Sequence, residues 1–368
     1  MKISCTQAKL NKGLSIVSRI VGTRTTLPVL SNIYLEAKDG QLKLSATDLE
    51  IGVTTSIGAK VDEEGSLTVP ARLISDFIAA NSDENLELES KATTLHLKSQ
   101  RYEANIKGID SSEYPVLPEV SKDSLVELAV ADFTGAISEV VVACATDDTR
   151  PVLAGIYFKF DTDTLYLVAT DSYRLAEKKI DVPGLNINKE FIVPARTMQE
   201  ILRISSSVEN PEKIAISATE NQVSFNIAGT QVVSRLIEGA FPNYKQIIPS
   251  AYKSSAEIDL HDFSSAIKMA SLFARQGGNN VKIKFIAAEA IITSVADQVG
   301  DNISKVPAKS SADSEEITFN AKYIADILQV LPDKKLLFEV NDKFSAGAIR
   351  PEKAKDFVYI IMPLRVEE

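Results

Sequence analysis

The chain has 368 residues, of which 45% are hydrophobic, and its formal net charge is -10. An acidic total of this size argues against a protein covered with basic patches, and no apolar run approaches the ~18 residues that a membrane-spanning helix needs. The first residues also lack the apolar stretch of a signal peptide. Cys5 and Cys144 have no metal-ligand spacing, so we expect two reduced, buried thiols. These features predict a soluble cytoplasmic protein without a cofactor and without membrane contact.

The chain is predicted to open with a short strand and a helix whose buried face carries Leu10, Leu14, Val17 and Ile20. Alternating strands follow within residues 41–47 and 86–106. Between them, a second helix is expected to begin just after Pro70, because proline is typical of a helix start. The first part of the chain therefore reads as strand, helix, strands, helix, strands.

The same order of elements recurs in the rest of the chain. Asp132 and Asp262 are predicted to cap two further first helices, and strands are expected within residues 214–227 and 336–340. The apolar faces of these helices would be formed by Phe133, Ile137, Val140, Val141 and Cys144, and by Phe263, Ile267 and Ala270. This arrangement predicts an α+β fold.

Three segments of the chain resemble one another at a nearly constant interval. VPARLISDFI begins at Val69, VPARTMQEIL begins 124 residues later at Val193, and FNAKYIADIL begins 126 residues after that at Phe319. Residues 44–48 also recur as residues 167–171. A period this long is a whole domain. With proline-marked, polar stretches as linkers, we expect three modules, at residues 1–121, 122–252 and 253–368.

The sequence offers little that suggests catalysis. It contains no P-loop and no GxGxxG motif, and His96 and His261 are predicted to be surface residues. Thr47-Asp48 and Thr170-Asp171 each follow a predicted strand, where threonine and aspartate commonly close a turn. We therefore expect no enzyme, and a hydrolase that uses the Thr-Asp pairs is the alternative.

Basic residues are concentrated in particular helices. Residues 1–35 contain no acidic side chain. The expected basic positions are Lys2, Lys9, Lys12, Arg19 and Arg24 at the start, Arg72, Arg196, Arg203 and Lys322 in the second helices, and Lys268 and Arg275. If these helices faced one way, they would form a positive strip that attracts a phosphate backbone without reading its sequence. The predicted helix after Asp132 weakens this pattern, because it is mainly acidic.

Two further motifs, combined with the repeated VPAR helices, are distinctive. The run VATDSYRLA at residues 168–176 and the ending YIIMPLR at residues 359–365 resemble the bacterial sliding clamps, the beta subunits of DNA polymerase III. The resemblance covers the whole chain. It implies three clamp modules, each with two helices packed on antiparallel sheets, and a head-to-tail ring of two chains. Such a ring encircles duplex DNA and acts as a processivity factor without catalysis.

The resemblance also implies a pocket for short Leu- and Phe-rich peptides of the replicative polymerase, the clamp loader and other replication or repair proteins. By motif match, this pocket would contain Leu153, Thr170, Ser172, Tyr173, Arg174, Leu175, Pro242, Ile247, Ile360, Met362, Pro363, Leu364 and Arg365. The chain departs from the family pattern at Ser172-Tyr173, at Gln246 and in its extension over residues 366–368.

Two other sets of residues follow from the same resemblance. Contacts to DNA would come from Arg24, Arg72, Arg150 and Arg196, and the dimer joint would join Ile106 and Lys107 of one chain to Leu272 and Phe273 of the other. Lys107 would face Asp297 or Asp301 there. The alternative that stays open is a triplicated binding scaffold that does not encircle DNA. It predicts a monomer or an open dimer.

Overall fold

The computed structural model describes residues 1–22, 27–116, 124–147, 149–275, 278–296, 298 and 300–365. Arg24, Asp297, the extension 366–368 and most of the first expected linker lie outside these residues. The chain folds as two compact units. Unit 1 contains Met1–Phe133 and Gln199–Leu236, and unit 2 contains Thr134–Met198 and Ile237–Glu368. None of the helices in the described part of the chain combines the length and apolarity that a membrane crossing requires.

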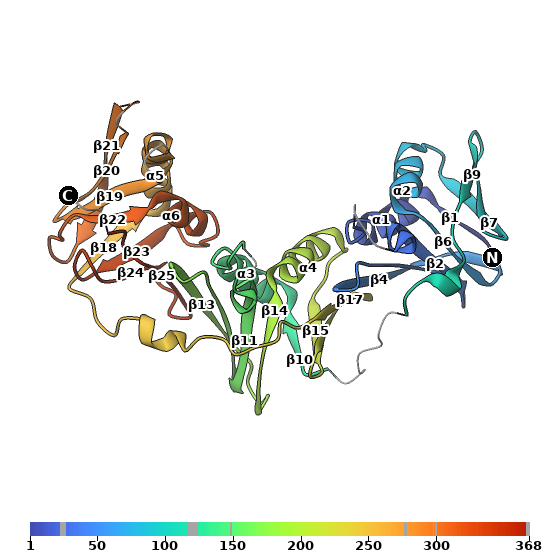
Figure 1. Cartoon of the computed structure of the whole chain (residues 1–368), viewed down its shortest axis with the longest axis horizontal. Coiled ribbons are helices and arrows are strands. Elements are labelled where there is room, and N and C mark those ends of the chain that lie inside the picture. Colours follow the sequence, from blue (N-terminus) through green and yellow to red (C-terminus); the bar gives the residue numbers. More distant parts are fainter. Residues whose placement is uncertain are drawn as a thin grey trace. The chain divides into compact units, whose positions relative to one another are not determined.

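Unit 1 contains two antiparallel sheets that are covered by helices (Figure 1). One sheet has the strand order β5-β1-β7-β8-β9, and the other has the order β10-β15-β16-β17-β4-β3-β2-β6. The strands are β1 (Lys2–Thr6), β2 (Asn32–Lys38), β3 (Gln41–Thr47), β4 (Ile51–Gly58), β5 (Lys60–Glu63), β6 (Gly65–Pro70), β7 (Asn85–Lys91), β8 (Thr94–Lys98), β9 (Glu103–Lys107), β10 (Val126–Ala129), β15 (Lys213–Ala218), β16 (Gln222–Ile227) and β17 (Thr230–Arg235). The strands expected within residues 41–47, 86–106 and 214–227 are thereby confirmed.

Helices α1 (Gln7–Val17) and α2 (Ala71–Ala80) pack side by side in unit 1, and α1 also lies against β3 and β4. Leu10, Leu14, Val17 and Ile20 are fully buried, as the periodicity predicted. Thr6 caps α1, since its side chain accepts a hydrogen bond from the Lys9 backbone N–H. The helices α3 (Val130–Val141) and α4 (Ala195–Ser207) each belong partly to both units.

Unit 2 is built on one antiparallel sheet with the order β14-β11-β12-β13-β25-β24-β23-β18-β21-β20-β19-β22. Its strands are β11 (Gly155–Thr162), β12 (Thr164–Thr170), β13 (Arg174–Asp181), β14 (Ile187–Pro194), β18 (Ser254–Asp259), β19 (Asn280–Ile286), β20 (Glu289–Ala296), β21 (Gly300–Ser310), β22 (Ile317–Asn320), β23 (Lys335–Val340), β24 (Gly347–Pro351) and β25 (Phe357–Ile361). Helices α5 (Leu260–Ala274) and α6 (Ala321–Leu328) pack together, and α5 lies on β20 and β21.

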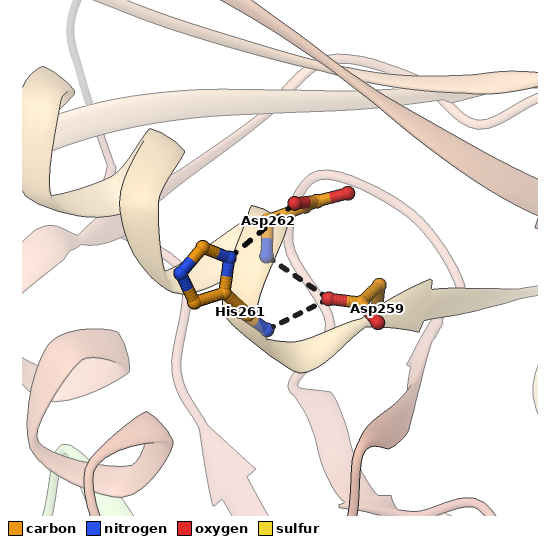
Figure 2. Close-up of side chains that lie close together, drawn as sticks. All are labelled: Asp259, His261 and Asp262. Atoms are coloured by element: carbon orange, nitrogen blue, oxygen red, sulfur yellow. Dashed lines mark hydrogen bonds and ion pairs between the residues drawn. The ribbon is translucent and has the colours of Figure 1, made fainter.

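The starts of two helices differ from the prediction. Helix α3 begins at Val130, so Asp132 lies in its first turn and is not the cap. Helix α5 is capped by Asp259, whose Oδ1 accepts the backbone N–H groups of His261 (2.9 Å) and Asp262 (3.1 Å), as Figure 2 shows. The reason is that a cap must precede the first helical residue, and each helix starts three residues earlier than a cap at its aspartate would place it. The Asp259, His261 and Asp262 cluster is therefore a helix start.

The two units join their modules in the same way. In unit 1, β4 pairs with β17 and Gly52 lies opposite Val233. In unit 2, β13 pairs with β25 and Leu175 lies opposite Ile360. Gly52 and Leu175 hold the same place in their hairpins, opposite Thr47 and Thr170 respectively. The fourth strand of one module thus pairs with the last strand of the next module in one register, which is the structural consequence of the sequence repeat.

Candidate functional site

The candidate site is centred on the turn between β12 and β13 in unit 2. Thr170 Oγ1 donates a hydrogen bond to the Arg174 carbonyl (2.6 Å) and accepts one from the Ser172 N–H (3.1 Å). Asp171 Oδ1 accepts the backbone N–H groups of Tyr173 (2.9 Å) and Arg174 (3.0 Å). Ser172 has a left-handed backbone, with φ of 79°. These contacts close a tight turn and leave Tyr173 exposed.

The first Thr-Asp pair makes the equivalent turn in unit 1. Thr47 Oγ1 donates to the Ile51 carbonyl (2.9 Å), and Asp48 Oδ1 accepts the N–H groups of Glu50 (3.0 Å) and Ile51 (2.8 Å). Leu49 has φ of 78°. Both aspartates therefore bind backbone N–H groups, which confirms the structural interpretation of the Thr-Asp pairs.

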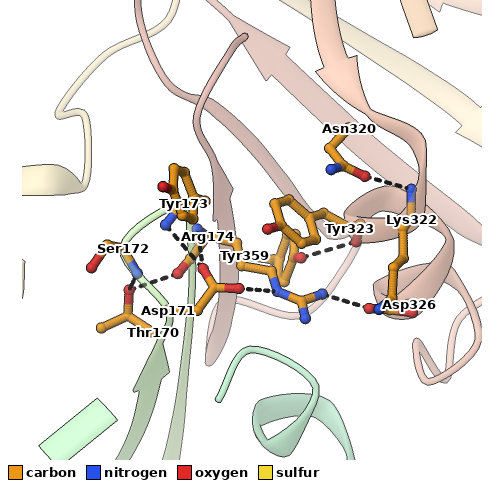
Figure 3. Close-up of polar contacts among 10 residues, drawn as sticks. All are labelled: Thr170, Asp171, Ser172, Tyr173, Arg174, Asn320, Lys322, Tyr323, Asp326 and Tyr359. Carbon is orange, nitrogen blue, oxygen red and sulfur yellow. Dashed lines mark hydrogen bonds and ion pairs between the residues drawn. The ribbon is translucent and has the colours of Figure 1, made fainter. Parts of the chain in front are cut away.

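Arg174 ties the unit 2 turn to helix α6. Its side chain is only 5% exposed, and its Nε and Nη1 atoms bind Asp171 (3.0 Å) and Asp326 (2.7 Å). The guanidinium also lies 4.4 Å from the ring centre of Tyr323, as seen in Figure 3. Burial alone would lower the pKa of Arg174, but Tyr359, Asp326 and Asp171 hold that pKa above its usual value. Arg174 is therefore a charged, fully engaged side chain of the interior.

Strand β25 brings the end of the chain to this turn. Leu175 lies opposite Ile360 in the β13–β25 pair, and both side chains are buried. The Met362 N–H donates to the Tyr173 carbonyl (2.9 Å). The Tyr173 ring stacks on Tyr323, with 6.5 Å between ring centres. Residues from the start of β13, the end of β25 and α6 thus meet at one end of these two central strands.

The short helix η4 (Tyr244–Ile247) approaches the same residues. Tyr244 is buried in a cluster with Leu175 and Ile360, and its hydroxyl donates to Glu177 (2.7 Å). Pro242 and Ile247, which lie within three residues of Tyr244 in the sequence, are exposed. Burial is the main cause that raises the pKa of Tyr244, and Glu177 raises it further, so the hydroxyl stays protonated as a donor.

Leu153 belongs to another short helix, η3 (Pro151–Leu153), and is buried. The residue before this helix, Arg150, donates from Nη1 to Ser172 Oγ (3.0 Å). At the chain end, Pro363 and Leu364 are half-buried, Arg365 is exposed, and the Leu364 N–H donates to the Thr318 carbonyl (2.8 Å).

The predicted pocket residues lie in unit 2, and we call the binding surface that they would form the turn groove. Leu175 and Ile360 are buried and would form its floor, whereas the apolar residues Tyr173 (58% accessible), Ile247 (41%) and Met362 (38%) are exposed and would form its rim. Exposed apolar side chains that gather around a buried floor are typical of a binding site. The arrangement suits the apolar side chains of a peptide.

Sequence reasoning missed several residues of this region: Tyr323, Asp326, Tyr359, Tyr244 and Phe344. Tyr323 and Asp326 lie in the third copy of the VPAR segment, so the repeat could have marked them as helical but not as neighbours of Arg174. Phe344 is exposed in the loop before β24, and the nearby Ala346 packs in the Tyr244 cluster.

The predicted DNA-binding arginines have different surroundings. Arg72 is almost fully exposed on α2, with Asp76 at 3.8 Å, and Arg196 is exposed in the first turn of α4. Arg150 is exposed and reaches Ser172, as described above. Arg203 is engaged: it donates to the Ser15 (3.2 Å) and Ile16 (2.9 Å) carbonyls at the end of α1.

The predicted joint residues lie on β9 and α5. Ile106 is buried and Lys107 is exposed at the end of β9, an edge strand of its sheet. Leu272 is exposed and Phe273 is half-buried on α5. Three more exposed apolar residues, Met269, Val295 and Ile303, come from α5, β20 and β21.

Sheets packed under pairs of helices in a threefold sequence repeat define a DNA clamp. Family models for the DNA polymerase III beta subunit match residues 1–118 as its N-terminal domain, 127–243 as its central domain and 245–365 as its C-terminal domain. The chain belongs to this family, the bacterial sliding clamps. The predicted fold class and the predicted family are thereby confirmed.

Relatives and solved structures agree with this assignment. The chain is 32% identical over 360 residues to the beta sliding clamp of Staphylococcus aureus, covering 94% of both chains. It is 30% identical over 375 residues to that of Synechococcus elongatus, covering 100% of both. The sliding clamp of Bacillus subtilis superimposes with a TM-score of 0.94 at 27% identity and full coverage of both chains. A Bartonella birtlesii clamp bound to griselimycin gives 0.93 at 27%, also with full coverage of both chains. The protein is a DNA sliding clamp, and a ring-shaped homodimer follows from the family.

Proposed function

We propose that this sliding clamp tethers the replicative polymerase, the clamp loader and other replication or repair proteins through the turn groove. The observation that supports the proposal is that Tyr173, Ile247 and Met362 are apolar and exposed, and that they belong to segments whose Leu175, Ile360 and Tyr244 share one buried cluster. Leu and Phe side chains of a short peptide would bury apolar area there. One linear peptide of this kind would bind with a Kd of about 1 μM, or about -8 kcal/mol. Two grooves per ring would strengthen the binding of a bivalent partner.

Removing residues 362–368 tests this proposal. The truncation deletes Met362 from the rim and also Pro363, Leu364 and Arg365, while β25 ends at Ile361 and stays intact. We expect the loss of binding of a fluorescein-labelled Leu- and Phe-rich peptide, measured by fluorescence anisotropy. The dimer, measured by sedimentation velocity, should persist. Undiminished peptide affinity would show that the groove is not the peptide site.

We also propose that Arg24, Arg72, Arg150 and Arg196 contact the phosphates of the encircled DNA. The support is the exposure of Arg72, Arg150 and Arg196 on or beside helices. Phosphate contacts carry no sequence information, so a ring that holds DNA in this way can slide along it. Closure of the ring retains the DNA, and the protein needs no catalysis for this task. Its place of action would be the cytoplasm.

The repeat predicts how two chains would join. Asn105, Val233 and Ile360 hold equivalent positions in the last hairpins of the three modules. Their partners across the hairpin are His96, Ser224 and Ala348 respectively. Asp301 in β21 holds the position that Leu175 holds in β13, because Asp301 lies opposite Val295 as Leu175 lies opposite Thr170. If the joint between chains repeats the register of the two joints within a chain, β9 pairs with β21 of the second copy and Asn105 lies opposite Asp301.

Side chains around this strand pair suit a joint between chains. The exposed apolar residues Met269, Leu272, Val295 and Ile303 of one copy would be covered, with Phe273 beside them. Ile106 is already buried in its own sheet, so β9 would contribute its backbone edge and Lys107. We keep residues 1–121, 122–252 and 253–368 as the proposed module boundaries.

A further inference from the structure

The three second helices carry an acidic side chain at the same position. Counted from the alanine that begins each helix, this position is Asp76 in α2, Glu200 in α4 and Asp326 in α6. Asp76 pairs with Arg72 of its own helix at 3.8 Å, and Glu200 pairs with Arg203 of its own helix at 2.7 Å. Asp326 instead pairs with Arg174, which lies in another module at the turn groove, at 2.7 Å.

The backbone of the turn does not need this ion pair. In unit 1 the equivalent turn has Ile51 where unit 2 has Arg174, and it still forms the threonine and aspartate hydrogen bonds. The local sequence is therefore sufficient to close the turn. What the Arg174 side chain adds is a connection from the turn to α6, through Asp326 and the face of the Tyr323 ring.

This connection determines where the rim of the groove lies. Tyr173 precedes Arg174, stacks on Tyr323 and binds the Met362 N–H through its carbonyl. The Tyr359 hydroxyl donates to the Tyr323 carbonyl (2.9 Å), which fixes α6 to β25. Two of the exposed rim residues, Tyr173 and Met362, thus depend on the same contacts, and Figure 3 shows Tyr173 beside Arg174 and Tyr323. A rim that is fixed before the peptide arrives saves the entropy of ordering it during binding.

We propose that Asp326 is a positioning residue for the turn groove: by holding Arg174, it places Tyr173 and Met362 for peptide binding. The proposal rests on the peptide-binding function proposed above. Asp326 is half-buried, and its action passes through Arg174. Removing its charge leaves a buried guanidinium with Asp171 as its remaining carboxylate partner, so the turn is freed to move away from α6.

The test compares Asp326→Asn with Asp76→Asn, a matched control at the same helix position with a 73% exposed side chain. The probe is the fluorescein-labelled Leu- and Phe-rich peptide, at a temperature where all variants are folded by circular dichroism. We expect Asp326→Asn to raise the peptide Kd about tenfold, and Asp76→Asn to change it less than about twofold. Asp326→Glu keeps the charge and should restore part of the affinity. If the asparagine variant does not fold, the peptide Kd of the glutamate variant serves as the measurement in its place.

A double-mutant cycle separates positioning from a general loss of structure. In an Arg174→Met background, Asp326→Asn should have no further effect on the peptide Kd, because the partner through which it acts is absent. Wild-type affinity in a folded Asp326→Asn variant would overturn the inference, as would fully additive effects of the two substitutions. Failure of the wild-type protein to bind the peptide would instead reject the groove itself.

Discussion

Arg203 connects helix α4 to the end of helix α1, and its replacement by methionine should destabilise unit 1. Its two terminal nitrogens donate to the Ser15 and Ile16 carbonyls, and its Nε binds Glu200 at 2.7 Å. The last carbonyls of a helix have no partners within the helix, and a cation near them is favourable. Methionine keeps the aliphatic stem and removes all three hydrogen bonds.

The size of the effect follows from these contacts. Hydrogen bonds to charged groups contribute about 1.5–3 kcal/mol each, but Arg203 and Glu200 are each nearly one-fifth exposed, so solvent screens part of that value. We therefore expect a loss of about 2–3 kcal/mol of local stability. Hydrogen exchange of the backbone amides from Ser15 to Ile20 should accelerate by a corresponding factor of about 30–150. The matched control, Arg72→Met, removes a 95% exposed side chain and should leave these amides unchanged.

DNA binding provides a second measurement on the same two variants. Because Arg203 already binds carbonyls, its loss should leave the salt dependence of DNA binding unchanged. Arg72→Met should reduce the slope of log K against log salt by about 0.9 for each phosphate contact that the ring loses. Two results in the Arg203→Met variant would refute the role of Arg203 in the contact between α4 and α1. One is a hydrogen-exchange rate at Ser15 to Ile20 equal to that of the wild type, and the other is a reduced salt slope of DNA binding.

Two further results are expected. Replacing Leu272 and Phe273 by alanine should raise the dimer dissociation constant in sedimentation velocity. Asn105→Cys combined with Asp301→Cys should trap a disulfide-linked dimer on oxidation, whereas Asn105→Cys combined with Asn302→Cys is out of register and should trap far less. Equal trapping by the two cysteine pairs would contradict the proposed strand pairing. Burial raises the pKa of Cys5 to about 11 and that of Cys144 to about 12, so neither thiol should react with iodoacetamide at pH 8 in the folded protein, and both should react in urea; rapid alkylation of the native chain would contradict their burial.

The sequence predicted local structure well, because each local feature repeats. The spacing of Leu10, Leu14 and Val17 defined a buried helix face, and the Thr-Asp pairs defined two turns that the structure confirms. The errors concerned helix starts, because aspartate is favoured both at the N-cap and within the first helical turn. Asp132 and Asp262 favour any position in a first helical turn, so their presence alone could not fix where α3 and α5 begin.

Sequence patterns did not predict the contacts between segments that are distant in the chain. Arg203 was included in the predicted positive strip for DNA. Its partners are the Ser15 and Ile16 carbonyls, and a contact with backbone atoms cannot be predicted from residue types. Asp326 and Tyr323 belong to a helix that the repeat identified, yet their contact with Arg174 depends on how β13 and β25 pair. The resemblance supplied the groove residues in β13 and β25 and did not supply the α6 residues that hold them.

The equivalent turns in the two units bear on the number of binding sites that one ring offers. In unit 1 the Arg235 N–H donates to the Glu50 carbonyl (3.0 Å), as the Met362 N–H does to Tyr173, and the Arg235 and Glu50 side chains lie 3.7 Å apart as an ion pair. The same backbone thus presents charge at one joint and apolar surface at the other. The valency of the clamp is therefore set by a few side chains and not by its architecture, so one groove could be altered without changing the ring that carries it.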